Sequence, residues 1–125
     1  MFDWTDYLDL ARQLAKCPAE AFQRSAISRA YYASYCQSRN WLVQKGEIIP
    51  EHTTDHNKVW FAMQRRKMRE TVQIEQEGKR LRDQRNMADY DDVVDNLDFR
   101  VSISLRHAEK INKLITALRN SGNKK

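Results

Sequence analysis

The residues best suited to chemistry lie in the stretch RDQRNMADYDD, which runs from Arg82 to Asp92. It ends a helical pattern whose inward-facing positions step by four, three, four and three. These positions hold Ile74, Gly78, Leu81, Arg85 and Ala88. Arg85 therefore stands where a leucine is expected. Because burying an unpaired guanidinium is prohibitively costly, Arg85 must reach a carboxylate, face a cleft or meet a second subunit.

Two interpretations of Arg85 follow from its neighbours. Asp89 and Asp92 are four and seven residues further on, so a salt bridge at the helix end would explain Arg85. Such a pair contributes only about 0.2–0.5 kcal/mol when exposed. Alternatively, Arg85 belongs to clusters of basic residues that can neutralise phosphates, although charge runs of this kind usually form an ordinary solvated face. The clustered basic residues are Arg65, Arg66, Lys67, Arg69, Lys79, Arg80, Arg82 and Arg85.

Composition limits the class of protein. The 125 residues suit one domain, and only three Gly and two Pro leave little material for hairpins or glycine-rich phosphate loops. No run of about 18 apolar residues is present, and the start is acidic where a secretory signal is basic. Cys17 and Cys36 are isolated. We therefore expect a cytoplasmic protein without membrane contact, disulfide or cofactor.

Apolar residues at helical spacing predict five helices. We expect the first, second, fourth and fifth helices at about 3–16, 18–44, 72–90 and 96–119. The third helix should begin at a cap formed by Thr53, Thr54 or Asp55 and end in the basic RRKMR at 65–69. Short connections between long helices favour an all-α, antiparallel bundle of four to five helices. A single domain over 1–120 and a flexible tail over 121–125 are predicted.

The second helix is predicted to lie at the centre of the bundle. Its small residues allow close helix packing, and they are Ala21, Ser25, Ala26, Ser28, Ala30, Ala33 and Ser34. Tyr31 and Tyr32 cannot face the same way, since neighbours lie about 100° apart on a helix. One tyrosine should be in the core and the other exposed or at an interface. Surplus aromatic residues on the first two helices predict a homodimer.

Three stretches resemble the small bacterial HEPN proteins in order and separation over nearly the whole chain. They are RSAISRAYYASYC at 24–36, DHNKVWFAM at 55–63 and LRDQRNMADYDD at 81–92. The resemblance implies an all-α bundle that forms a symmetric dimer. Many members are RNA-cleaving toxins or parts of antiphage and CRISPR-linked systems, while others only bind RNA or nucleotides. Many are encoded beside a minimal nucleotidyltransferase that serves as antitoxin.

The family's catalytic motif is an Arg, often followed by a polar residue such as Asn, with a His four to six positions on. Arg85 and Asn86 match it, and Tyr90 stands at the position of the His. A phenol has a pKa near 10, compared with about 6.5 for imidazole, so Tyr90 is poorly suited to proton transfer at neutral pH. The resemblance therefore implies a catalytically impaired module that binds RNA or nucleotide. Its expected phosphate-binding residues are Lys79, Arg80, Arg82, Arg85, Asn86 and Tyr90.

Three alternatives stay open. The chain could be a metal-independent endoribonuclease toxin in which Tyr90 or His107 replaces the motif His, with a nucleotidyltransferase partner as antitoxin. Tyr90 could instead accept a nucleotide from that partner, as tyrosines near the motif do in the family. The third alternative is a structural adaptor whose basic segment docks on an acidic surface.

The three histidines predict no metal site. His52 and His56 are four apart but straddle a loop and a helix start, with no third ligand in view. His56 resembles a His that recurs in the family and caps or contacts the second helix. Arg100 and His107 have an Arg-to-His spacing that we interpret as coincidence, because no polar residue follows the Arg.

Overall fold

The computed structural model of the protein describes residues 1–48 and 55–122, and these residues form five helices and no strand. The helices are α1 Thr5–Ala15, α2 Glu20–Gln44, α3 His56–Arg65, α4 Arg69–Tyr90 and α5 Leu97–Gly122. The predicted all-helical bundle is thus confirmed. None of the described helices is long and apolar enough to span a bilayer.

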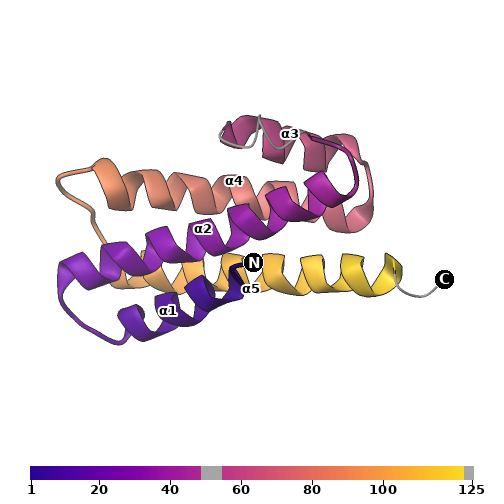
Figure 1. Ribbon diagram of the computed structural model, residues 1–125. Helices are drawn as coiled ribbons and strands as arrows, with labels where there is room; N and C mark the ends of the chain where they lie inside the picture. Colours follow the sequence, from indigo (N-terminus) through magenta and orange to yellow (C-terminus); the bar gives the residue numbers. More distant parts are fainter. Residues whose placement is uncertain (49–54, 123–125) are drawn as a thin grey trace.

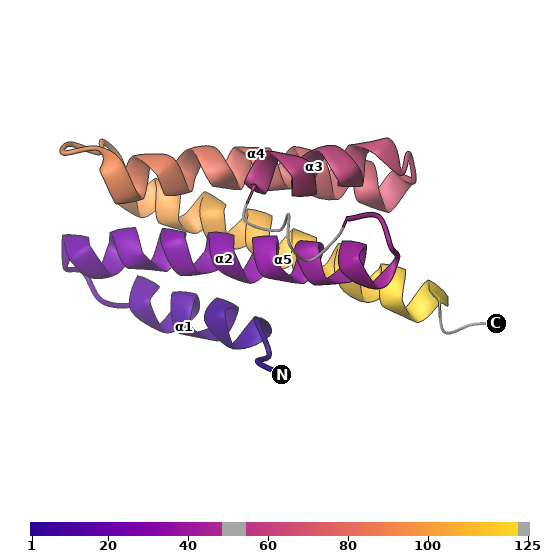
Figure 2. The ribbon, with the colours of Figure 1, turned by 45° about the horizontal axis from the view of Figure 1, so that its top comes forward.

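The helices form an elongated bundle in which chain neighbours α1 and α2, and α4 and α5, are antiparallel (Figure 1). The longest helices, α2 and α5, run in the same direction, which the prediction of a simply antiparallel bundle did not include (Figures 1 and 2). The long connection formed by α3 and α4 makes this possible, because it returns the chain to the end where α2 began.

The helix boundaries differ from the prediction mainly at α4 and α5. The α4 helix begins at Arg69 because Thr71 Oγ1 accepts a hydrogen bond from the Met68 backbone N–H at 3.1 Å. This cap starts α4 three residues before the predicted Val72. The α5 helix continues to Gly122, so 121 and 122 are helical, and the rest of the predicted tail, 123–125, lies outside the described residues.

The α2 helix is central, as predicted, because it packs against all four other helices. Its small residues Ala26, Ala30, Ala33 and Ser34 are each at most 1% exposed, which permits close helix approach. Tyr31 is fully buried in the core. Its neighbour Tyr32 is only partly buried, so the expected division of roles between the two tyrosines is present.

The aromatic side chains of the first two helices are mostly accommodated within one bundle. Tyr31, Tyr35 and Trp41 are at most 3% exposed, and only Phe2 and Phe22 are about half exposed. The surplus that suggested a dimer is therefore smaller than expected. Apart from the terminal Met1, the most exposed large apolar side chains lie instead around the connection between α4 and α5.

Trp60 on α3 packs directly over Gly78 on α4. A Cβ atom at position 78 would lie less than 3.0 Å from three carbons of the indole ring. Gly78 was predicted only as a member of the inward-facing series. The structure explains why position 78 holds a glycine. Because glycine has no side chain, the Trp60 ring reaches the core and α3 packs against α4.

Candidate functional site

Arg85 lies on the buried face of α4 and is only 7% exposed. The other members of the inward-facing series, Ile74, Gly78, Leu81 and Ala88, are buried as well, so the predicted helix phase is confirmed. The guanidinium carbon of Arg85 is 5.1 Å from the ring centroid of Tyr31 and 5.6 Å from that of Tyr32. These distances suit cation–π attraction. Arg85 thus faces aromatic rings of α2 and does not project into bulk solvent.

Within the described part of the chain, Arg85 donates no hydrogen bond, and its Nε is buried without a partner. The nearest carboxylate oxygen, Asp89 Oδ2, lies 3.8 Å from Nη1, too far for a hydrogen bond. Ser28 Oγ also donates to Asp89 Oδ2, at 3.3 Å. The predicted helix-end pair therefore exists, but it leaves the buried Nε–H of Arg85 without a hydrogen-bond partner among the described residues.

A second cationic side chain, Arg82, lies about one turn before Arg85 on α4. Its Nη1 donates to Asn57 Oδ1 at the start of α3, whereas its Nε is buried and has no partner among residues 1–48 and 55–122. Arg82 thus joins the beginning of α3 to the middle of α4. Two guanidiniums with unused donors stand close to each other on one face of the bundle.

His56 is brought to this cluster by the first turn of α3. Asp55 caps α3 by accepting a hydrogen bond from the Asn57 backbone N–H at 3.0 Å, as one of the predicted caps. The imidazole of His56 stacks on Tyr35 with a centroid distance of 4.0 Å. Its Nδ1 lies 2.7 Å from the Tyr31 hydroxyl. The predicted contact between His56 and the second helix is confirmed.

The direction of the Tyr31–His56 hydrogen bond follows from Trp60. The indole N–H of Trp60 can only donate, and it donates to the Tyr31 oxygen at 3.3 Å. The Tyr31 hydroxyl proton is then best used by donating to Nδ1 of His56. We infer that the neutral His56 ring carries its proton on Nε2, which makes Nε2–H a further donor of the cluster.

Burial and the two arginines keep His56 neutral. Burial is the main cause that lowers the pKa of His56 to about 4, and the positive charges of Arg85 and Arg82 lower it further. Burial likewise raises the pKa of Tyr35 to about 12. At pH 7 the charged groups of the cluster are therefore Arg82 and Arg85, with the carboxylates of Asp89 and Asp55 beside them. The cluster favours an anion that accepts hydrogen bonds.

The remaining predicted site residues are placed differently. Tyr90 is 73% exposed, but its ring centroid is 5.9 Å from the guanidinium carbon of Arg85, so it borders the cluster. Asn86, Lys79 and Arg80 are exposed, and Lys79 is paired with Glu75 at 3.0 Å. The structure thus brings Arg82, Arg85 and Tyr90 together with Tyr31 and His56.

Arg24 holds the end of α4 in place, a role that sequence analysis did not detect. Its guanidinium donates to the backbone oxygens of Ala88, Asp91 and Asp92 at 3.0, 2.5 and 3.1 Å. These carbonyls follow the last helical hydrogen bonds and need external donors. Arg24 therefore positions the segment that carries Asp89 and Tyr90. An arginine at the start of the second helix gives no local signal for this long-range contact.

His107 is distant from the Arg85 cluster. Its Nδ1 contacts Glu77 Oε2, and Lys110 Nζ lies 3.2 Å from the other oxygen of Glu77. Glu77 precedes Arg85 by eight residues, or about 12 Å along α4. Within one bundle, His56 and not His107 is therefore the histidine beside Arg85.

The two other histidine patterns considered from the sequence, Arg100 with His107 and His52 with His56, form no further site among the described residues. Arg100 donates to the backbone oxygen of Asp95 and to Gln84 Oε1, at 2.8 and 3.2 Å, so its partners differ from those of His107. No group of three metal-ligating side chains occurs among the described residues. His52, which was considered as a metal ligand together with His56, lies outside the described residues.

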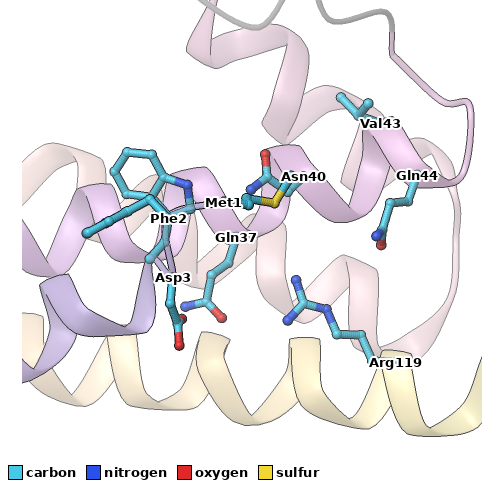
Figure 3. A pocket seen from close by; sticks show the side chains of 9 residues that line it. Met1, Phe2, Asp3, Gln37, Asn40, Val43, Gln44 and Arg119 are labelled. Atoms are coloured by element: carbon cyan, nitrogen blue, oxygen red, sulfur yellow. The ribbon is translucent and has the colours of Figure 1, made fainter.

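A separate hollow of about 270 Å³ lies between the N-terminal segment, α2 and α5. Figure 3 shows Gln37 and Asn40 of α2 and Arg119 of α5 around it, with Phe2 from the N-terminal segment. It shares no lining residue with the Arg85 cluster. The two features are therefore distinct.

No family model, curated protein or solved structure matches this chain. The resemblance to HEPN proteins thus rests on the three sequence stretches and stays a prediction. The chemistry of the site is derived from its own geometry.

Proposed function

We propose that this protein is a HEPN-like, homodimeric module that binds RNA or a nucleotide by holding a phosphate group against Arg85 and Arg82. It would act with a partner protein, such as a minimal nucleotidyltransferase or another component of a toxin–antitoxin or antiphage system. The order of the three HEPN-like stretches supports the family and the symmetric dimer. The five-helix bundle is compatible with that family.

The buried Nε–H of Arg85, which has no hydrogen-bond partner among the described residues, carries the proposal. An arginine that is 7% exposed and donates no hydrogen bond within the described chain is costly to maintain. A phosphate offers several anionic acceptors, and arginine matches them in paired geometry. Tyr90 borders the same cluster with an exposed ring on which a base can stack. Since position 90 holds no imidazole, we propose binding without cleavage.

Fluorescence anisotropy with a labelled single-stranded RNA tests this proposal. Arg85→Gln should weaken binding at least tenfold, since a charged hydrogen bond is worth about 1.5–3 kcal/mol. Arg106→Gln is the matched control, because Arg106 is an exposed arginine on α5 with no ion-pair partner in the described region. Affinity should also fall steeply between about 50 and 200 mM salt.

The proposal fails if wild-type and Arg85→Gln proteins bind RNA and nucleotides equally while both remain folded by circular dichroism. Light scattering after size exclusion tests the dimer separately. A strictly monomeric mass at high concentration would contradict the proposed dimer but not the proposed phosphate site.

The second candidate function is a metal-independent endoribonuclease, and His56 is the observation that favours it. The imidazole lies close enough to Arg82 and Arg85 for their charges to act on it, so the cluster contains a histidine that the motif itself lacks. Cleavage would then require His56 as well as Arg85. Purified protein incubated with RNA and a chelator should produce fragments that His56→Gln abolishes and His107→Gln does not. Intact RNA at high protein concentration argues against this candidate.

Tyr90 also suits the proposed role of nucleotide acceptor. Its side chain is 73% exposed, whereas Tyr31 and Tyr35 are buried. An incoming nucleotidyl group can therefore reach Tyr90 but not those two. Intact mass after co-expression with a nucleotidyltransferase partner should increase by one nucleotidyl group, and Tyr90→Phe should prevent it. Tyr32→Phe is the control. An unchanged wild-type mass rejects this role.

A further inference from the structure

The connection between α4 and α5 and the first turn of α5 carry two apolar side chains that are largely exposed. Val93 is 79% exposed and Phe99 is 64% exposed. Four aspartates that surround them in sequence, Asp91, Asp92, Asp95 and Asp98, are exposed and form no ion pair within the described chain. Negative charge at the start of α5 explains Asp95 and Asp98. It does not explain why the side chains of Val93 and Phe99 are exposed to solvent among these aspartates.

The surface around the connection between α3 and α4 carries the opposite charge and an apolar groove. Lys67 and Arg69 are exposed there and have no carboxylate partner within the described residues. Beside them is an apolar groove of about 420 Å³. It is lined by Phe61, Gln64, Arg65, Lys67 and Val72. Phe61 itself is 59% exposed, so the groove is open at its rim.

The two surfaces lie at opposite ends of the molecule. Figures 1 and 2 show the α3–α4 and α4–α5 connections at the two ends of α4. The 22 residues of α4 separate them by about 33 Å. We name them the basic end, residues 61–72, and the acidic end, residues 91–99.

We propose that the acidic end of one copy docks into the basic end of another copy, with Val93 and Phe99 facing the groove at Phe61. Exposed apolar groups ringed by charge mark protein contacts, and complementary charge selects the partner. Two acidic ends cannot pair symmetrically, because the unpaired aspartates of both copies would face each other. The chain itself carries the required basic, grooved surface.

The consequence is open-ended assembly. A contact between different surfaces of identical chains is heterologous, and it forms filaments or rings unless an end is blocked. The docking surfaces are small, so association should be weak and dependent on concentration. This assembly differs from the symmetric dimer and does not require the phosphate site.

Sedimentation velocity of the full chain across a wide concentration range tests the contact. The wild type should grow in mass without a fixed endpoint, and higher salt should reverse that growth by screening the charges. Val93→Asp with Phe99→Asp blocks the acidic end, and Phe61→Lys blocks the basic end. These positions are largely exposed, so both variants should stay folded, which thermal circular dichroism checks.

Mixing the two variants provides the decisive measurement. Each variant alone should lose the concentration-dependent growth. An equimolar mixture should regain one junction, and only one, because each partner retains one functional end. A wild-type mass that does not vary with concentration, or a mixture that behaves as the sum of its parts, overturns the proposal. Arg85→Gln should assemble like wild type, which separates this contact from the phosphate site.

Discussion

The hydroxyl oxygen of Tyr31 on α2 lies 2.7 Å from Nδ1 of His56 on α3. The same oxygen accepts the indole N–H of Trp60, and the Tyr31 ring lies beneath the guanidinium of Arg85. One fully buried phenol therefore connects three helices and contacts the charge on which the proposed function depends. The following predictions test this arrangement.

Tyr31→Phe should lower the free energy of unfolding by about 1–3 kcal/mol. The reason is that Nε1 of Trp60 and Nδ1 of His56 both lose the Tyr31 hydroxyl as their hydrogen-bond partner. Urea unfolding followed by circular dichroism measures the change. Tyr32→Phe is the matched control, since its hydroxyl forms no hydrogen bond within the described chain. It should change stability by less than about 0.5 kcal/mol. Equal effects from both substitutions would contradict the role of Tyr31.

Stability should depend on pH through His56. Burial, assisted by Arg85 and Arg82, lowers the pKa of His56 to about 4 in the folded protein, compared with about 6.5 when unfolded. The unfolded chain then binds more protons between these values, so stability is complete above about pH 6.5 and decreases as the pH falls toward 4. Because His56 is partly exposed, we expect a loss of only about 1–2 kcal/mol.

The comparison of wild type with His56→Gln isolates this contribution from other titrating groups. The stability difference between the two proteins should shrink as the pH is lowered from 7 toward 4. NMR titration of the His56 ring provides a direct check. A ring that titrates near 6.5 would show that its neighbours do not hold it neutral.

A bound phosphate should raise the pKa of His56. Anionic oxygens between Arg82 and Arg85 would offset the positive charges that help to lower this pKa, although burial would remain. NMR titration of His56 with and without pyrophosphate measures the shift. By linkage, pyrophosphate should bind more tightly as the pH falls through the His56 transition. An unchanged His56 titration at saturating pyrophosphate would place the ligand elsewhere.

Gly78→Ala should destabilise the protein although alanine is the better helix former. The added Cβ would collide with the Trp60 ring, and overpacking of this kind typically costs about 1–3 kcal/mol. The gain in helix propensity, about 1 kcal/mol, offsets only part of this cost. In a Trp60→Leu background the same substitution should become neutral or stabilising. Thermal unfolding of the four proteins in this cycle measures the coupling.

Arg24→Met should loosen the end of α4 by removing the donors to Ala88, Asp91 and Asp92. We expect a loss of about 1–2 kcal/mol and faster amide exchange in the last turn of α4. Arg12→Met, at an exposed ion pair on α1, should cost less than about 0.5 kcal/mol. If exchange at 87–92 is unchanged in Arg24→Met, Arg24 does not anchor this segment.

Local patterns in the sequence were enough to predict the five helices, the central place of α2 and the inward position of Arg85. Each of these follows from local spacing: apolar residues repeat with the helical period, small residues mark close packing, and the series through Leu81 and Ala88 sets the phase of α4. The same spacing identified Asp55 as a possible cap and Arg85 as an arginine in a leucine's position. The spacing therefore predicted the buried arginine around which the cluster is arranged.

The residues that surround this arginine depend on how the helices pack. His56, Tyr31 and Arg24 are separated from Arg85 by 29, 54 and 61 residues, and periodicity carries no information on which faces of different helices meet. The parallel course of α2 and α5, and the close approach of Trp60 to Gly78, depend on packing of whole helices. Packing also left Asn86, Lys79 and Arg80 exposed. Contacts between distant segments form because they satisfy buried area and hydrogen bonds jointly, and no single segment encodes that balance.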